Sequence, residues 1–222
     1  MDLIKIDYTG KLEDGTIFVT TKKEIADKND IYIEGETYKP EILYPGEEYD
    51  PITKKIIEEL KECKVNDKKS ITIPKELTGK YDPKLVKTLP SSIFKKGTKL
   101  LVGQLINYQG KIGKIVSVGS GRVVVDFNSI TTGKTLIYDV EVKGIAKTDE
   151  EKLSFIIEKV FDHPENIKAH ILGDEKDKYI EITLPKEEYF NEYILHRKQQ
   201  MLNSVSRYLK IHKIIFKEEW KI

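Results

Sequence analysis

Residues that commonly carry enzyme chemistry are few in this sequence and lie far apart. The chain has one cysteine, Cys63, and four histidines, and none is spaced to share a metal ion or to activate a nucleophile. Gly133-Lys134-Thr135 resembles the end of a phosphate-binding loop, but position 128 is Asn where that motif requires glycine. The run also leads into a predicted strand, whereas such loops lead into a helix. The sequence therefore predicts no metal, no cofactor and no covalent intermediate.

The N-terminal elements that would position a site read mainly as strands. Residues 1–8 alternate apolar and polar side chains, and Asp14-Gly15 is a turn signal before Ile17-Phe18, which together predict a hairpin. Residues 52–63 place apolar side chains at helical spacing, and 70–73 read as a further strand. This mixture predicts an α+β region in which a short helix accompanies a sheet.

From Pro83 onward the sequence changes to short strands and glycine-containing turns. The β-branched runs 114–118 and 122–127 flank Gly119-Ser120-Gly121, which is a hairpin signal. This segment resembles the small β-barrels of some ribosomal and elongation proteins, where aromatic and basic groups contact RNA. A role in RNA or ribosome binding therefore stays open beside that of a plain β-subdomain.

The charged residues 147–151 indicate a boundary before a third region. Beyond it the pattern predicts a helix at 150–161, a hairpin within 167–184, a long helix at 186–209 and a strand at 212–220, an αββαβ unit able to close a two-layer domain. Aromatic side chains beyond the apolar stripe of the long helix, or near the end of the chain, predict contacts between protomers of a homodimer. These are Tyr189, Tyr193, His196, Tyr208 and Trp220.

Composition limits the class of partner. Lys and Arg number 38 and Asp and Glu 37, so the net charge of +1 disfavours a dedicated nucleic-acid binder. The first residues lack the apolar run of a signal peptide, and no stretch approaches the ~20 apolar residues of a membrane span. We therefore expect a cytoplasmic protein that makes no contact with a membrane.

The first hairpin, residues 8–21, reads Y-T-G-K-L-E-D-G-T-I-F-V-T-T. It strongly resembles the pattern Y-T-G-x-L-x-D-G-x-x-F-D-[ST]-[ST] of the FKBP-type peptidyl-prolyl isomerases and departs from it only at Val19, where the family has Asp. Weaker matches follow at 52–60 to V-I-x-G-[WL]-x-x-A-L, at 74–79 to P-x-x-A-[YF]-G and at 138–142 to F-x-V-x-V. The resemblance covers about residues 1–147.

An insertion between Asp82-Pro83 and Asn128 resembles that of the SlyD-like and long archaeal branch of this family. In that branch the insert is a small β-domain that holds unfolded chains. The resemblance implies an α+β fold: an FKBP-like antiparallel half-barrel wrapped on a short helix, a small inserted all-β domain and a C-terminal αββαβ domain. The implied domain ranges are 1–82 with 129–147 for the isomerase, 83–128 for the insert and 148–222 for the C-terminal domain.

The resemblance implies a peptidyl-prolyl cis–trans isomerase with chaperone activity, acting on proline-containing and unfolded polypeptides. Such an enzyme needs an aromatic, water-poor cup and no cofactor, because it has only to bind the twisted amide better than the planar one. By resemblance the residues of the cup are Tyr8, Phe18, Val19, Ile52, Thr53, Ile56, Thr78 and Tyr138, with the Thr53 N–H anchoring a substrate carbonyl. The residues expected to bind unfolded chains are Leu89, Phe94, Leu100, Leu101 and Val102.

Several positions of the implied cup depart from the family. Val19 replaces Asp, Lys55 replaces Gly, Ile56 replaces Trp or Leu, and Thr78 replaces Tyr or Phe; Thr53 stands where the family has an apolar residue. Loss of one polar orienting group typically costs a few kcal/mol in catalysis. We therefore expect lowered turnover, and a non-catalytic polypeptide-binding chaperone remains the alternative.

Overall fold

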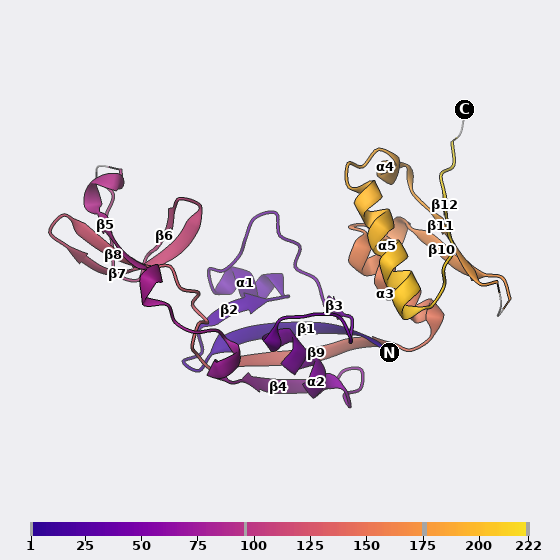
Figure 1. Ribbon diagram of the computed structural model, residues 1–222, viewed down its shortest axis with the longest axis horizontal. Coiled ribbons are helices and arrows are strands. Elements are labelled where there is room, and N and C mark those ends of the chain that lie inside the picture. The colour runs from indigo at the N-terminus through magenta and orange to yellow at the C-terminus, as the bar shows by residue number, and fades with distance from the viewer. Residues whose placement is uncertain (1, 96, 175–176, 221–222) are drawn as a thin grey trace. The chain divides into compact units, whose positions relative to one another are not determined.

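The computed structural model describes residues 2–95, 97–174 and 177–220 of the protein (Figure 1). The chain divides into two compact units: Met1–Thr9, Val19–Ile71 and Asp139–Ile222 form the first, and Gly10–Phe18 and Thr72–Tyr138 the second. Met1 and Ile222, at the outer limits of the predicted domains, lie outside the described residues. Few helices accompany sheets whose strand pairs are mostly antiparallel, in agreement with the expected α+β class.

The N-terminal sheet has the strand order β2-β1-β9-β4, and β3 pairs antiparallel with β1. Its strands are β1 (Leu3–Leu12), β2 (Ile17–Thr20), β3 (Glu41–Leu43), β4 (Lys68–Ile73) and β9 (Leu136–Ala146), with the short helix α1 at Lys23–Lys28. The predicted turn at Asp14-Gly15 is present, and Gly15 has the positive φ of 87° that a glycine adopts without strain. The Asp14 carboxylate accepts the Thr16 N–H at 2.9 Å, which lowers the pKa of Asp14 and fixes the turn.

Helix α2 (Pro51–Leu60) begins where the sequence predicts it. Asp50 is its N-cap and accepts hydrogen bonds from the backbone of Ile52 (2.9 Å) and from the backbone and hydroxyl of Thr53 (3.2 and 2.6 Å). Pro51 suits the first helical position because its missing N–H would be unpaired there in any case. The apolar stripe of Ile56, Ile57 and Leu60 is buried, so the helix is held by both a cap and a core.

The second unit contains a separate antiparallel sheet with the order β5-β8-β7-β6. Its strands are β5 (Val86–Pro90), β6 (Leu105–Tyr108), β7 (Lys111–Gly119) and β8 (Arg122–Asp126); the 3₁₀ turns η1 (Lys75–Leu77), η2 (Pro83–Leu85) and η3 (Ser91–Ile93) lie before and within it. Leu89, Ile115, Val123 and Val125 form its core. Gly113 is required there, because a Cβ at this position would lie 2.6 Å from the Phe127 ring.

One amide side chain joins the two ends of the segment that carries this sheet. The Asp82 N–H donates to Asn128 Oδ1 and Asn128 Nδ2 donates to the Asp82 carbonyl, both at 3.0 Å. The same Nδ2 and the Asn128 backbone N–H each donate to Asp126 at 2.8 Å, and Tyr81 donates to the other Asp126 oxygen at 3.0 Å. Residues 82 and 128 are therefore fixed to one another.

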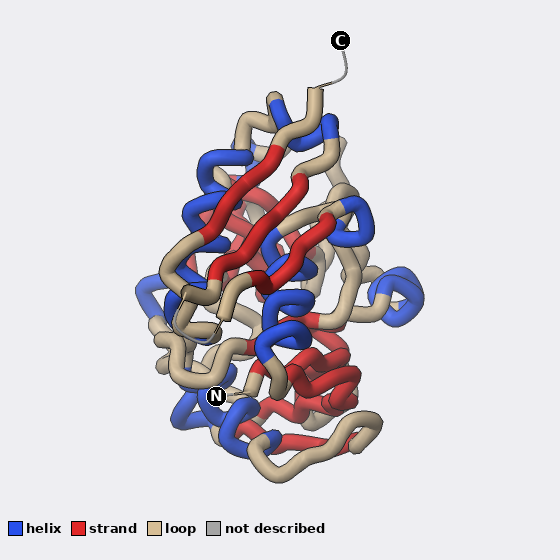
Figure 2. Tube along the Cα trace, turned by 90° about the vertical axis from the view of Figure 1, so that its right-hand side faces the viewer, coloured by secondary structure: helices blue, strands red, loops and turns tan. Residues whose placement is uncertain are grey.

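The C-terminal region contains a sheet of order β10-β11-β12, in which β11 runs antiparallel to β10 and parallel to β12 (Figure 2). Its elements are α3 (Asp149–Val160), η4 (Pro164–Asn166), β10 (Lys168–Leu172), β11 (Tyr179–Thr183), α4 (Lys186–Tyr189), α5 (Ile194–Tyr208) and β12 (Ile214–Lys217). A capping box of Thr148 and Glu151 starts α3.

The single helix predicted at 186–209 is wrong, since α4 and α5 are separate. Asn191 accepts the Tyr193 N–H on its side chain, a local bond that competes with helix continuation. A buried ion pair between Arg197 of α5 and Glu188 of α4 (2.7 Å) then holds the two helices together. Phe190 lies at the break and is 84% exposed.

The core of the C-terminal region extends onto the N-terminal sheet. Leu3 of β1, Ile42 of β3 and the adjacent Tyr44 belong to the same buried cluster as Ile156 of α3 and Tyr208 of α5. The Tyr44 and Tyr208 rings lie 4.9 Å apart between centroids. Tyr208 is therefore buried in this core, which leaves little of its ring for the predicted contact between protomers. No helix in the described ranges is long and apolar enough to cross a membrane.

The Asp50 cap makes the stability of α2 dependent on pH. Burial has the largest single effect and pushes the Asp50 pKa up, but the hydrogen bonds from Thr53 and Ile52 together outweigh it and leave the pKa lowered. A carboxylate with a lowered folded-state pKa stabilises the fold above its unfolded-state pKa and loses that contribution as pH falls through the folded value. Replacing Asp50 with Ala should cost about 1 kcal/mol at pH 7, measured by urea denaturation.

The matched variant Asp50→Asn keeps an N-cap acceptor that does not titrate. We expect its stability to fall below that of the parent at pH 7 and to converge with the parent below about pH 4. A constant difference between parent and Asp50→Asn from pH 7 to pH 3 would contradict the role assigned to the charged cap.

Candidate active site

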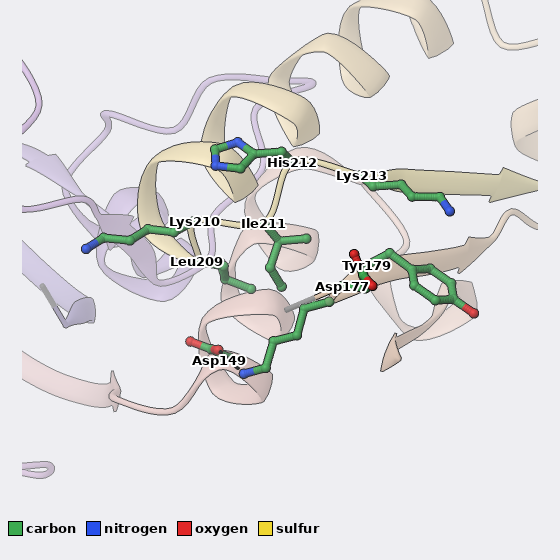
Figure 3. A pocket seen from close by; sticks show the side chains of 9 residues that line it. Asp149, Asp177, Tyr179, Leu209, Lys210, Ile211, His212 and Lys213 are labelled. Carbon is green, nitrogen blue, oxygen red and sulfur yellow. Dashed lines mark hydrogen bonds and ion pairs between the residues drawn. The ribbon is translucent and has the colours of Figure 1, made fainter. Parts of the chain in front are cut away.

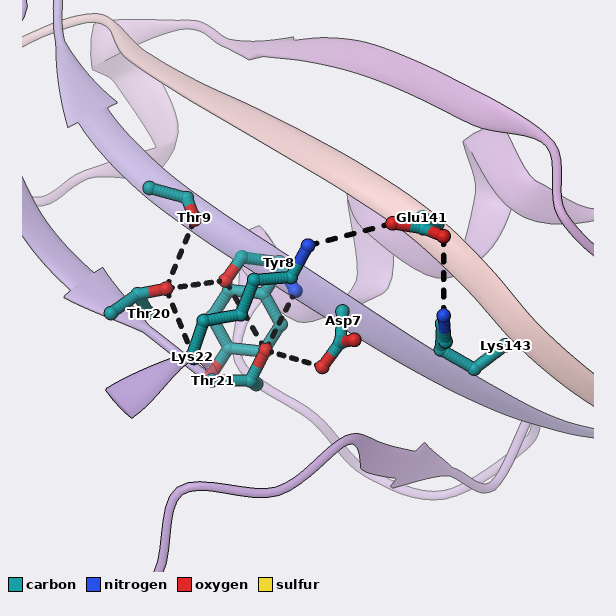
Figure 4. A network of polar contacts seen from close by, with 8 residues as sticks. All are labelled: Asp7, Tyr8, Thr9, Thr20, Thr21, Lys22, Glu141 and Lys143. Carbon is teal, nitrogen blue, oxygen red and sulfur yellow. Dashed lines mark hydrogen bonds and ion pairs between the residues drawn. The ribbon is translucent and has the colours of Figure 1, made fainter. Parts of the chain in front are cut away.

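Tyr8 is held in β1 by two threonines that follow Val19 (Figure 4). The Tyr8 N–H donates to the Thr21 hydroxyl at 3.0 Å, and the Thr20 hydroxyl and Thr21 N–H donate to the Tyr8 carbonyl at 3.1 and 3.0 Å. The Thr21 hydroxyl donates in turn to Asp7 at 2.9 Å. These bonds fix the register of β1 against the end of β2, which accounts for the two hydroxyl residues at the end of the hairpin motif.

Tyr8 and Val19 line the same cavity of about 250 Å³ in the first unit. The other walls are Thr20 and Thr21, the segment 36–42, and Glu158 and Lys159 at the end of α3. This volume lies below the ~300–1,000 Å³ of sites for small molecules, so it suits a single side chain of a polypeptide. Val19 contributes a methyl surface at the position where the family has a carboxylate.

Phe18 and Tyr138 form an aromatic pair in the second unit. Their ring centroids lie 5.8 Å apart at an interplanar angle of 83°, an edge-to-face contact. Tyr138 is buried and Phe18 is half-buried, so the pair leaves part of one ring accessible. Two of the predicted aromatic residues are thus brought into direct contact.

The start of α2 differs from the expectation in one respect. Ile52 and Thr53 are half-buried and Ile56 is buried, as a supporting wall requires. The Thr53 N–H, expected to anchor a substrate carbonyl, already donates to Asp50. A substrate carbonyl would therefore have to compete with a charged N-cap for this donor.

Lys55 belongs to a cluster of ion pairs on the surface of α2. Its ammonium lies 2.8 Å from Glu59, which also pairs with Lys69 of β4 at 2.8 Å. Hydrogen bonds from Lys55 and Lys69 lower the pKa of Glu59 to about 2. The Glu59–Lys69 pair thus links α2 to β4, and Lys55, which replaces the family's glycine, joins this cluster from within α2.

Thr78 has a structural role that the sequence did not indicate. It is buried at the end of η1, and its hydroxyl lies 2.9 Å from the carbonyls of both Lys75 and Lys134. The one hydroxyl hydrogen is shared between these two acceptors. Thr78 therefore has no donor left over for a substrate, unlike the tyrosine it replaces.

The residues predicted to bind unfolded chains separate into two groups. Leu89 is buried, and Phe94 and Leu100 are half-buried against the core of the inserted sheet. Leu101 and Val102 are 52% and 67% exposed. Sequence reasoning missed Leu105 and Ile112, which are 66% and 67% exposed on the face of the β6–β7 hairpin opposite its core side. Leu105 and Ile112 each precede a residue of the opposite face, Ile106 and Gly113, and this strand alternation could have identified them as exposed.

A second, larger cavity lies in the C-terminal region. A hollow of about 850 Å³ near β11 is lined by Asp149, Lys178 and the segment 209–213, and Lys210 and Lys213 point away from its centre (Figure 3). Lys178 pairs with Asp149 at 3.4 Å. Within the described ranges, no group of three or more His, Cys, Asp or Glu side chains is arranged to hold a metal ion.

Comparison with known proteins adds independent evidence. The family described as FKBP26, IF domain, matches residues 87–129. The chain is 30% identical over 161 residues to a short-type peptidyl-prolyl cis-trans isomerase of Methanocaldococcus jannaschii, covering 68% of this chain and 95% of that protein.

Two SlyD proteins are also similar. The FKBP-type peptidyl-prolyl cis-trans isomerases SlyD of Escherichia coli and Pasteurella multocida are 33% and 30% identical over 95 residues, which cover 40% of this chain. The alignment spans 48% of each SlyD chain, so about half of those proteins is matched. The hairpin motif, the aromatic pair and these matches agree, and the chain belongs to the FKBP-type peptidyl-prolyl cis-trans isomerases of the SlyD-like kind.

Proposed function

We propose that this isomerase acts on X–Pro bonds of unfolded polypeptides, which it binds in part through the inserted sheet. The observation that carries the catalytic proposal is the cavity that Tyr8 and Val19 share, small enough for one side chain and adjacent to the family's hairpin motif. The exposed apolar side chains of the insert support the binding proposal. We further propose three domains, 1–82 with 129–147, 83–128, and 148–222, supported by the separate sheets β5–β8 and β10–β12.

The chemistry requires no reacting side chain. Rotation about an X–Pro bond is slow because it removes amide resonance, at a barrier of about 20 kcal/mol. The twisted amide is less polar than the planar one, so a water-poor apolar recess binds it preferentially and accelerates rotation. We assign proline binding to Tyr8 and Val19, which line this cavity. A role of Phe18 and Tyr138 in substrate contact stays a prediction from the family resemblance.

The cup offers few free polar groups to the substrate, and we therefore expect this enzyme to turn over more slowly than other family members. The donors at Thr53 and Thr78 are engaged within the protein, and Val19 offers no polar group. This observation also favours the second candidate function, a chaperone that binds proline segments without isomerising them. Measured turnover separates the two candidates.

Restoring the family's carboxylate should raise turnover. Val19→Asp places a polar group in the cavity beside Tyr8, where Lys39 and Lys159 can offset its charge. One recovered polar contact corresponds to roughly a 10- to 100-fold rate gain. The measurement is the cis-to-trans relaxation of a proline tetrapeptide.

Val19→Asn is the matched control, because it has the same shape without the charge. We expect its rate to lie between those of the parent and Val19→Asp. Folded parent and Val19→Asp proteins that both lack turnover would refute the isomerase proposal and favour the non-catalytic chaperone. A parent already as fast as Val19→Asp would show that the departure at residue 19 has no catalytic cost.

The insert should bind unfolded chains through the surface of Leu101, Val102, Leu105 and Ile112, called here the insert patch. Burial of one such side chain contributes about 1.5–3 kcal/mol. Unfolded chains can provide the apolar groups that cover it, whereas folded surfaces seldom do. Leu89 supports this surface from the core without touching a ligand, because it is buried.

Removing two side chains of the insert patch should weaken chaperone activity. The double variant Leu101→Ser and Val102→Ser should suppress aggregation of a denatured test protein at least tenfold less effectively, with an unchanged melting temperature. Ile130→Ser, also at an exposed apolar residue but outside the inserted sheet, is the control and should keep parental activity. Equal suppression by the double variant and this control would contradict the binding role.

We also propose a homodimer formed through the C-terminal region. Phe190, Tyr193, Leu195 and Trp220 are exposed, and the Phe190 and Tyr189 rings lie 5.7 and 5.0 Å from the ring of Trp220. Exposed aromatic clusters of this kind are enriched in protein interfaces. Tyr193 and Trp220 from the original aromatic set thus support the proposal, whereas Tyr208 does not.

Sedimentation of the full chain tests this surface. We expect the parent to sediment as a dimer and the variant Phe190→Ser with Leu195→Ser to dissociate at least tenfold more readily, because the core of each protomer is untouched. Val65→Ser, at an exposed apolar residue outside the C-terminal region, should behave as the parent. A monomeric parent at all concentrations would refute self-association.

A further inference from the structure

The wall of the Tyr8 cavity formed by residues 36–42 has little structure of its own. Only its last residues enter β3, a three-residue strand that pairs with β1. Gly35, just before it, has a φ of 85°, a conformation that marks a turn. In the described part of the chain, no second strand pairs with β3. Something besides the sheet must therefore hold this wall in place.

Two lysine-to-carbonyl bonds connect the wall to the end of α3. Lys159 Nζ donates to the Ile42 carbonyl at 2.7 Å, and Lys39 Nζ donates to the Glu158 carbonyl at 3.2 Å. Each side thus contributes one ammonium and one carbonyl. Lys39 also places a positive charge at the C-terminal turn of α3, where the helix dipole favours it.

Lys159 is well supported in this position. Its ammonium lies 4.1 Å from the centroid of the Tyr44 ring, a cation–π contact. Lys159 as a whole residue is exposed, yet the loss of water around its ammonium lowers its pKa. Glu158 pairs with Lys5 of β1, the residue opposite Ile42 in the β1–β3 register. The end of α3 therefore contacts both strands behind the wall.

We infer that α3 of the C-terminal region is a working part of the prolyl-binding site, in which Lys159 positions the 36–42 wall opposite Tyr8 and Val19. Lys159 and Glu158 themselves line the cavity together with those residues. This inference rests on the proposed function of the cavity and adds to it a positioning residue from a separate region of the chain. A displaced wall would widen the recess and admit water, which weakens substrate binding before it affects the bond rotation.

The test is Lys159→Met in the full chain, which keeps the length of the stem and removes the ammonium. We expect KM for a proline tetrapeptide to rise about tenfold, kcat to change less than twofold, and amide hydrogen exchange in 36–43 to accelerate. Lys159→Arg retains a donor for the Ile42 carbonyl and should restore most of the parental KM. Lys168→Met, at an exposed lysine of β10 outside the cavity, is the control.

The outcomes separate this inference from the proposed function. An active parent with the same KM in Lys159→Met and Lys168→Met would refute the positioning role and leave the isomerase assignment intact. A parent without turnover would refute the proposed function and this inference together. If kcat fell and KM rose to a similar extent in both Lys159→Met and Lys159→Arg, and the melting temperature fell as well, Lys159 would be a merely structural residue. That outcome would also overturn the positioning role.

Discussion

The first unit depends on one strand that is buried on both of its faces. Pleat alternation directs Leu3 into the core shared with α3 and α5, while Ile4 and Ile6 are buried on the opposite face. Both edges of β1 are also used, by β3 on one part and by β2 and β9 in the sheet order. A shift of register by a single residue would exchange the two faces and disrupt both cores at once. Tyr8 keeps its place because this strand has no alternative register.

Polar groups near the candidate site mostly serve the fold. The hydroxyls of Thr20 and Thr21 hold β1 to β2, the Thr53 N–H completes the cap of α2, and the Thr78 hydroxyl joins two loops. An isomerase can tolerate this shortage of free hydrogen-bond donors better than a hydrolase can, because amide rotation creates no charge that a donor must neutralise. Rigidity and dryness of the recess then matter more than the number of donors it presents.

Elements that depend on neighbouring residues in the sequence could be predicted from it. The turn at Asp14-Gly15 was readable because turn chemistry is confined to two adjacent residues. The helix predicted at 150–161 was readable from its residue pattern, and α3 begins one residue earlier. The interruption between α4 and α5 was missed, because apolar spacing continues across Asn191 while its side chain ends the helix. The contact between Lys159 and Ile42 left no signal, since a lysine bonded to a backbone carbonyl has no sequence pattern of its own. The hairpin motif identified Tyr8 and Val19, but not the distant helix that completes their cavity.

The amide bridge between Asp82 and Asn128 has a mechanical consequence. It connects the two points where the chain enters and leaves the segment of β5 to β8, through a pair of 3.0 Å hydrogen bonds. Tension applied to the chain on either side of this segment would pass across this bridge before it reached the strands beyond it. The inserted sheet would bear that load only after the hydrogen bonds of the Asn128 amide had broken, so one side chain shields β5 to β8 from force transmitted along the chain.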